Sequence, residues 1–252
     1  MHRKSKMTGL FGMSVLLLLP QLALSGGGSL YRVTISNLTA GQPFTPPVLA
    51  IHNNKTGIFT LGEETSAELQ QIAENGNNGP LVNLLSSDDN VRAVVSRMTP
   101  IVPANNPVGA PFGSSETFEI WAGGKAKYLS IVSMLICTND GFMGIDTIRL
   151  PSKKRTVFAD AYDARTEENT EVYANMVPPC QALIEGINPP VGGTGMSDDA
   201  LFEEGVVIPH AGINGGADLQ SQLHGWGDPV AKIVIERVRH NDHDDDSDSD
   251  SD

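Results

Sequence analysis

Apolar and polar residues alternate along several short segments of this chain, with the period of two that is typical of β-strands. In residues 30–38, LYRVTISNL, the apolar residues Tyr31, Val33 and Ile35 alternate with polar ones, which indicates a strand with one wet face. Further segments have strand character: PPVLAIHN at 46–53, ETFEIWA at 116–122, DTIRL at 146–150, RTVFADAY at 155–162, EEGVVIPH at 203–210 and AKIVIERV at 231–238. Turn signals separate them, so we expect an all-β protein with an antiparallel β-sandwich or barrel.

One apolar segment and two helical segments complete this pattern. Residues 127–136, KYLSIVSMLI, are almost continuously apolar, which predicts a strand buried on both faces. Residues 65–76, TSAELQQIAENG, predict a short helix, because Thr65 and Glu68 have capping-box spacing and Gly76 is a stop signal. The segment GPLVNLLSS at 79–87 suggests further helical turns. The expected fold is therefore a β-sandwich with a small helical insertion.

The first residues have the features of a secretory signal peptide. Arg3, Lys4 and Lys6 precede an apolar stretch that ends near Leu24, and small residues stand where a signal peptidase reads. We expect residues 1–25 to be a signal peptide and the protein to be secreted, or periplasmic or on the cell surface in a bacterium. An uncleaved membrane anchor is the alternative, but the stretch is short and contains Pro20. No later segment is long and apolar enough for a transmembrane span.

The other end of the sequence, HNDHDDDSDSDSD, contains seven aspartates and no apolar residue. We expect residues 239–252 to form a disordered acidic tail. Without the signal and the tail, 23 acidic and 14 basic residues remain, a formal charge of −9. This acidity argues against nucleic acid and anionic membranes as partners and disfavours a heparin-like polyanion. An unknown extracellular ligand, protein or glycan, is the partner that we expect.

Cys137 and Cys180 are the only cysteines of the chain. In a secreted protein an isolated pair predicts one disulfide, and two buried free thiols are the alternative.

Several kinds of catalytic chemistry have no sequence signal here. There is no G-x-S-x-G nucleophile elbow, P-loop, dinucleotide fingerprint or H-E-x-x-H motif. His240 and His243 have ligand-like spacing but fall in the acidic tail, where a weak, incidental pair is the simpler interpretation. His210 lies in a glycine-rich segment, where it either lines a ligand-binding rim or bonds backbone groups. We therefore do not predict an enzyme.

Acidic side chains follow two of the predicted strands. Asp140 comes after the buried strand of residues 127–136, Asp163 ends the strand RTVFADAY, and Glu167 follows four residues later. Calcium takes six to eight oxygen ligands, mainly from carboxylates and carbonyls, and loops at one end of a sandwich can supply them. Acidic loops are usually just solvated, so the spacing alone is a weak signal for a metal site.

The residues around these carboxylates resemble those of a known family. SMLICTNDGFMGID at 133–146 and YDARTEEN at 162–169 are similar to the paired loop motifs of spondin domains, and the resemblance spans residues 30–238. It implies a β-sandwich with C2-like topology. It also implies one bound calcium ion whose carboxylate ligands are Asp140, Asp163 and Glu167.

The chain departs from the family pattern at three positions. Arg165 stands where the family usually has glycine, Glu167 replaces an aspartate, and Cys137 occupies a position where proline is common. Glycine often serves a turn with positive φ, which arginine tolerates poorly, and the arginine charge would compete with a cation. These departures bear on calcium affinity more than on the fold.

The expected function is that of a secreted calcium-binding spondin-domain protein, an extracellular binding or adhesion module. A secreted β-sandwich hydrolase acting on an extracellular polymer is one alternative. A calcium-buffering envelope protein is another.

Overall fold

The computed structural model describes residues 28–190, 193 and 196–239. The predicted signal peptide and all but the first residue of the predicted tail lie outside the described residues. The strands are β1 Gly28–Asn37, β2 Val48–His52, β3 Val91–Ser96, β4 Ser115–Gly123, β5 Tyr128–Met134, β6 Gly141–Arg149, β7 Lys154–Asp163, β8 Ile208–Pro209 and β9 Ala231–Arg237. The α-helices are α1 Ala67–Asn75, α2 Gly79–Ser87, α3 Pro179–Ile184 and α4 Ser221–His224, with short 3-10 helices η1 Tyr173–Asn175 and η2 Asp199–Leu201.

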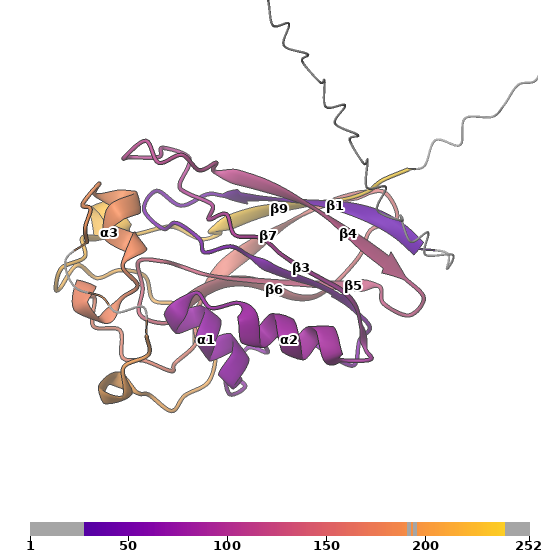
Figure 1. Ribbon diagram of the computed structural model, residues 1–252, viewed down its shortest axis with the longest axis horizontal. Coiled ribbons are helices and arrows are strands. Elements are labelled where there is room, and N and C mark those ends of the chain that lie inside the picture. Colours follow the sequence, from indigo (N-terminus) through magenta and orange to yellow (C-terminus); the bar gives the residue numbers. More distant parts are fainter. Residues whose placement is uncertain (1–27, 191–192, 194–195, 240–252) are drawn as a thin grey trace, which may run out of the picture.

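All strand pairs are antiparallel, in the order β3-β2-β5-β6-β7-β9-β1-β4, with β8 paired to β7. Strand β7 divides this order into two layers, because its first part, residues 154–159, pairs with β9 and its last part, residues 160–163, pairs with β6. One layer contains β4, β1 and β9, and the other contains β3, β2, β5 and β6 (Figure 1). The expected all-β sandwich with a small helical insertion is confirmed.

Two hydrophobic cores explain why some strands alternate and others do not. The first core lies between the layers and includes Val33, Leu49 and Ile131, which are completely buried. The second lies on the outer face of β2 and β5, where helices α1 and α2 cover the sheet (Figure 1). Strand β2 is buried at all five positions because its side chains alternate between the two cores. The same arrangement accounts for the continuous apolar sequence of β5.

Helix α1 begins one residue later than the capping-box spacing predicted. Ser66 is its N-cap, and its side chain accepts a hydrogen bond from the N–H of Leu69. The hydroxyl of Thr65 instead donates to the carbonyl oxygen of Ala164 and so ties the helix start to the second acidic loop. The predicted stop is confirmed, since Gly76 has a φ of 63°.

Three strand predictions need correction. Strand β3 was not predicted, because its sequence VRAVVS is short and only half-buried. Strand β6 begins at Gly141, five residues before the predicted strand DTIRL, so it includes the last residues of the loop motif SMLICTNDGFMGID. Only two residues of the segment EEGVVIPH form a strand, β8, which lies at the edge of the sheet beyond β7.

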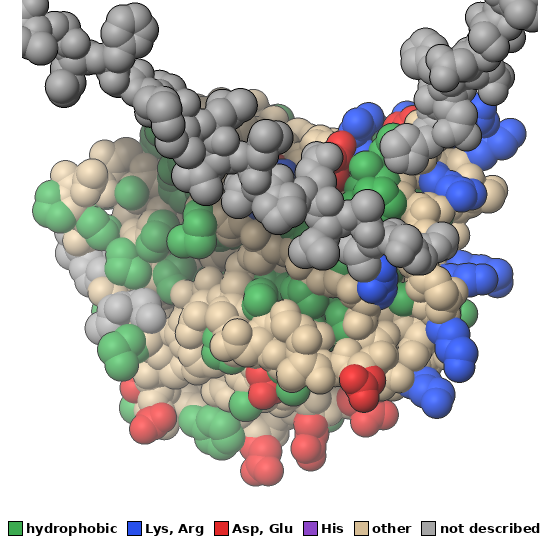
Figure 2. All heavy atoms as spheres, turned by 45° about the vertical axis from the view of Figure 1, so that its right-hand side comes forward, with side chains coloured by type: hydrophobic (Ala, Val, Ile, Leu, Met, Phe, Trp, Pro, Cys, Tyr) green, Lys and Arg blue, Asp and Glu red, His purple; other side chains and the backbone are tan. Residues whose placement is uncertain are grey.

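The sandwich has two chemically different ends. Strands β5, β6 and β7 run between them, so that the residues after β5, before β6 and after β7 meet at one end, on the left in Figure 1. Figure 2 shows Lys and Arg side chains gathered along the opposite, right-hand edge, and Asp and Glu side chains along the lower one. No helix in the described part of the chain is long and apolar enough to cross a membrane.

Candidate metal centre

The two acidic loops predicted from the sequence lie side by side at the left-hand end of the sandwich. The Oδ2 atom of Asp140 accepts hydrogen bonds from the backbone N–H groups of Thr166 at 2.7 Å and Glu167 at 3.0 Å. In the same direction, the N–H of Ala164 donates to the carbonyl oxygen of Asp140 at 3.2 Å. The first loop is therefore fixed to the second through the carboxylate that the motif predicted.

The turn before β6 directs Asp140 into the protein. The hydroxyl of Thr138 donates to the carbonyl oxygen of Leu135 at 2.6 Å and accepts from the N–H of Gly141 at 2.9 Å. A Cβ atom on Gly141 would lie 2.6 Å from the Thr138 hydroxyl oxygen and 3.0 Å from a ring carbon of His210, so only glycine fits. The tight turn leaves Asp140 with no exposed surface.

Asp163 closes strand β7 and organises the second loop. Its Oδ1 atom accepts the N–H of Arg165 at 2.7 Å, and its Oδ2 atom accepts the side-chain N–H of Asn169 at 2.8 Å. Arg165 has a φ of 55°, the left-handed conformation that the glycine of the family motif suggested. Its guanidinium forms an ion pair with Glu203 at 3.3 Å. The carboxylate of Glu203 therefore balances the arginine charge.

Glu167 completes the predicted trio and is 3% exposed. Its Oε1 atom accepts the N–H of Asp198 at 2.8 Å, and its backbone pairs with Phe202 in an isolated bridge. Segments from three distant parts of the chain, around Asp140, Glu167 and Asp198, thus converge here.

A fourth carboxylate, Glu74 of helix α1, was missed by the sequence reasoning. It is 4% exposed, and its Oε1 atom accepts the side-chain N–H of Gln70 at 2.7 Å. A glutamate in the last turn of a helix opposes the helix dipole, which is the signal that could have revealed it. Its charge acts on both Asp140 and Glu167.

Two oxygen atoms of this cluster lack any hydrogen-bond partner. Asp140 Oδ1 and Glu74 Oε2 are buried acceptors without a donor. An unpaired buried acceptor costs about 1–3 kcal/mol, and more when it is charged. Such a cost indicates that the two oxygens have a partner other than a protein donor, namely a proton, a water molecule or a cation.

The raised pKa values of two carboxyl groups in the cluster also indicate a place for a proton or a cation. Burial, followed by the charge of Asp163, raises the pKa of Asp140 to about 7, against the lowering effect of the Glu167 and Thr166 N–H groups. Burial also raises the pKa of Glu167 to about 7, and the charges of Glu74 and Asp140 add to the rise. At neutral pH both carboxyl groups therefore hold a proton for part of the time, and a cation would displace it.

The three predicted ligands do not form a closed shell. Among the described residues, the one group of three His, Cys, Asp or Glu ligand atoms within 4.8 Å of one another is Cys137, Cys180 and His224. Calcium binds oxygens at 2.3–2.6 Å, so a bound ion would have to draw the carboxylates closer by side-chain rotation. The residues present do fit a calcium ion in donor type and charge.

The sulfur atoms of that compact group are already committed to each other. Cys137 and Cys180 form a disulfide with an S–S distance of 2.15 Å, which confirms the predicted pairing. His224 is completely buried, and its Nδ1 atom accepts the N–H of Gln220. Gln42 holds the disulfide in place, because its side chain bonds the backbone N–H and carbonyl of Cys137. The disulfide is therefore a structural clasp, a covalent link between distant segments, and its Cys137 lies three residues before Asp140.

Two other buried polar residues nearby have structural roles. Glu171 accepts the N–H groups of Asn214, Gly215 and Gly216 and so orders that loop. His210 accepts the N–H of Gly212 through Nδ1, so it bonds the backbone, and burial lowers its pKa. His240 and His243 lie outside the described residues.

Comparison with known proteins adds no family name to this geometry. No protein-family model matches the chain, and no curated protein matches it. The site is therefore defined by the contacts above and by the motifs that predicted them.

Proposed function

We propose that this chain is a secreted calcium-binding protein of the spondin type, which acts as an extracellular binding or adhesion module. The observation that carries the proposal is the pair of buried, unpartnered carboxylate oxygens on Asp140 and Glu74. They belong to a cluster with Asp163 and Glu167, at the end of a β-sandwich where the spondin motifs predicted a calcium ion. Calcium would hold these four carboxylates together and replace their repulsion with attraction.

The composition of the cluster favours calcium over other metals. Its donors are carboxylates, and oxygen donors suit calcium or magnesium rather than zinc or copper. The segments that carry them approach the cluster from separate parts of the chain, which suits the flexible coordination of calcium. Magnesium demands near-ideal octahedral geometry and gives up its water molecules reluctantly, so it should bind less well.

The same geometry disfavours the hydrolase alternative. General acid catalysis needs a carboxyl group that can reach a substrate. Asp140 has no exposed surface, and Asp163 is 4% exposed. Carboxylates that hold a cation are also poor bases, because the cation keeps them ionised. A stabilising role for the metal is the simpler use of this site.

Thermal unfolding with and without calcium tests the proposal. Calcium binds only the folded state, so at a hundredfold excess over its dissociation constant it should stabilise by about 2.7 kcal/mol. Chelation should lower the melting temperature, and calcium should restore it.

Two matched substitutions on strand β7 locate the response. Asp163→Asn should abolish most of it, because it removes a charge at the cluster with little change in volume. Asp160→Asn should keep it, since Asp160 is exposed on the same strand and its pKa is raised by partial burial and Asp228, not by the cluster. A chelated wild-type protein that does not respond to calcium would refute the metal site. Loss of the response in Asp160→Asn alone would refute the ligand assignment.

A further inference from the structure

The right-hand end of the sandwich gathers most of the basic residues of the chain. Three clefts adjoin there, since the first and second share Gly124, Lys127 and Arg149, and the second and third share Arg237. Three of the seventeen Lys and Arg residues precede residue 28, and nine of the other fourteen line these clefts. Their acidic lining residues are Asp89 and Glu236 alone. We call this surface the basic band.

Seven cations of the basic band have no anionic partner. Within the described part of the chain, no ion pair or hydrogen bond engages the side chains of Lys55, Lys125, Lys127, Arg149, Lys153, Arg237 or Arg239. The protein otherwise has a large excess of acidic residues that could have been placed beside them. Like charges held close together without counter-charges repel, so their clustering indicates a ligand rather than a contribution to stability.

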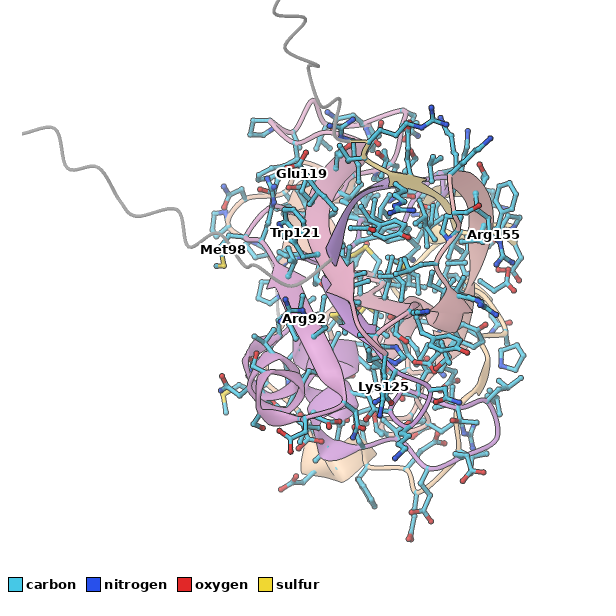
Figure 3. All side chains as sticks on the ribbon, turned by 90° about the vertical axis from the view of Figure 1, so that its right-hand side faces the viewer. Arg92, Met98, Glu119, Trp121, Lys125 and Arg155 are labelled. Carbon is cyan, nitrogen blue, oxygen red and sulfur yellow. A yellow bond between two sulfur atoms is a disulfide. The ribbon has the colours of Figure 1, made fainter. Side chains whose placement is uncertain are left out.

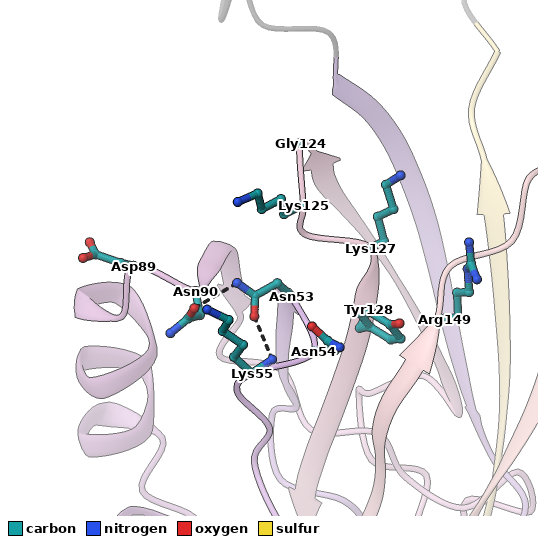
Figure 4. Close-up of a pocket in the computed structure, with 10 residues that line it drawn as sticks. All are labelled: Asn53, Asn54, Lys55, Asp89, Asn90, Gly124, Lys125, Lys127, Tyr128 and Arg149. Atoms are coloured by element: carbon teal, nitrogen blue, oxygen red, sulfur yellow. Dashed lines mark hydrogen bonds between the residues drawn. The ribbon is translucent and has the colours of Figure 1, made fainter.

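The first cleft, of about 550 Å³, has an ordered polar wall. The side-chain N–H of Asn53 donates to Asn90 at 2.9 Å, and the backbone N–H of Lys55 donates to the Asn53 side chain at 2.8 Å (Figure 4). Tyr128 lines the cleft and stacks on the buried ring of His52, with ring centres 6.4 Å apart. The carboxamides and the phenol are therefore held in place before any ligand arrives.

The lysines and the arginine reach into solvent around this wall. A tight hairpin between β4 and β5, with Gly124 at a φ of 62°, presents Lys125 and Lys127 at its tip. In Figure 4, Lys125 extends from the hairpin towards the Asn53 and Asn90 side, and Arg149 stands at the end of β6. In Figure 3, which looks onto this end, Lys125 lies well apart from Arg155. Flexible ammonium groups surround fixed hydrogen-bonding groups.

We propose that the basic band binds an anionic polysaccharide, one that carries sulfate or carboxylate groups. Spaced cations match the regular charges of such a polymer, and carboxamides both donate to and accept from sugar hydroxyls. The extracellular nature of the polymer rests on the proposed function, whereas the charge chemistry of the band stands by itself. Net acidity alone had disfavoured a polyanion, but net charge says nothing of how the charges are distributed.

Other polyanions fit the basic band less well. Proteins bind single-stranded nucleic acid by stacking its bases on several exposed aromatic side chains. Among the described residues that line the three clefts, Tyr128 is the one aromatic side chain that is not buried. A membrane surface calls for exposed apolar side chains beside the cations. None of the exposed large apolar residues of the described chain lines these clefts.

The test compares two double variants that remove the same charges. Lys125→Gln with Arg149→Gln changes the basic band, and Arg155→Gln with Lys232→Gln removes one lysine and one arginine that line none of the three clefts. Dextran sulfate, carboxymethyl dextran and unmodified dextran serve as ligands with one common backbone. The protein is made without N-glycosylation, because Asn54 belongs to the sequon NKT and lines the first cleft.

We expect a charged dextran to bind the wild-type protein and unmodified dextran not to bind. At low salt the band variant should bind about tenfold more weakly, and the control should change less than about twofold. The result should hold in calcium and in chelator alike, so that a failure of the calcium site leaves it intact. The chain ending at Arg239 should bind at least as tightly as the full chain, since the aspartates of residues 240–252 repel the ligand.

Three results would overturn the inference. The first is an absence of binding to both charged dextrans by the full and the shortened chain. The second is an equal loss of affinity in the two double variants, which would mean diffuse attraction without a site. The third is binding of single-stranded DNA or phosphatidylserine vesicles as tight as that of the charged dextrans, which would exclude the carbohydrate class.

Discussion

The two ends of this sandwich treat charge in opposite ways. At the metal-centre end, Asp140, Asp163, Glu167 and Glu74 are buried together, and two of their oxygens lack a partner. At the other end, the cations of the basic band are exposed and surrounded by water. Buried charge must be neutralised by a proton or a cation, whereas exposed charge needs only solvent. We therefore expect the first arrangement to affect stability and the second to affect binding.

The same strands connect these ends and keep them independent. Strand β6 begins beside Asp140 at Gly141 and ends at Arg149 in the first basic cleft. The eight steps from Gly141 to Arg149 span roughly 27 Å at about 3.4 Å per residue. This separation exceeds the Debye length of about 8 Å at physiological salt, so the two ends should respond separately to substitution.

Removal of the disulfide at the metal-centre end should cause the largest loss of stability of the changes considered. Cys137 and Cys180 are 43 residues apart, and closing a loop of that length stabilises by about 4 kcal/mol in the chain-entropy model. Replacing both with alanine should lower the free energy of unfolding by about that amount in urea titrations. Reductant should destabilise the wild type and leave the double variant unchanged. A loss below about 1 kcal/mol would show that the acidic end does not need this clasp.

Glu74 allows a sharper test, because its substitution should act in opposite directions with and without calcium. In chelator at pH 8, Glu74→Gln removes a buried charge beside Asp140 and Glu167 and should stabilise by about 1 kcal/mol. In calcium it should weaken the response, since a ligand is lost. Melting temperatures of the wild type and the variant, measured in chelator and in calcium, test both expected shifts. Equal shifts in both would remove Glu74 from the site.

Protonation should substitute for calcium at this end. The pKa of Asp140 and that of Glu167 are raised to about 7 in the folded protein, above the values of the unfolded chain. The folded state therefore binds more protons between about pH 4 and pH 7, and its stability falls as the pH rises through that window. Melting in chelator should occur at a higher temperature at pH 5 than at pH 8, and calcium should reduce the difference. The opposite slope in chelator would contradict the raised pKa values.

Substitutions at the basic end should have the smallest effect on stability. Lys125→Gln with Arg149→Gln removes exposed charges without ion pairs, so the free energy of unfolding should change by less than about 0.5 kcal/mol. Ending the chain at Arg239 should also leave the melting temperature nearly unchanged, because aspartate and serine side chains offer little apolar surface to bury. A large drop in either variant would show that this end is coupled to the core.

The sequence was a good guide to the strands and to the acidic loops. Period-two alternation identified β1, β4 and β9, because each has one face on the core and one in water. Strand β3 was missed because it lies at the sheet edge and is only half-buried, which weakens its pattern. The motifs predicted that Asp140 and the second loop belong to one site, and the hydrogen bonds between them show that the two are in contact.

Two features depended on the folded arrangement. Glu74 follows the apolar residues of α1 along the sequence, and nothing in the spacing links it to loops about 65 and 90 residues away. The basic band draws its residues from many separate strand ends, which only the sheet order brings together. Long-range pairing of this kind leaves no local signal in a single sequence.

Calorimetric titration of the chelated protein with calcium at pH 7, in two buffers with different ionisation enthalpies, tests the central claim most directly. Since Asp140 and Glu167 each have a pKa of about 7, a cation that binds both should release about one proton in total per ion. We expect one calcium ion per chain, release of about one proton, and loss of both in Asp163→Asn. Calcium binding without proton release would place the ion elsewhere, and no binding would contradict the account.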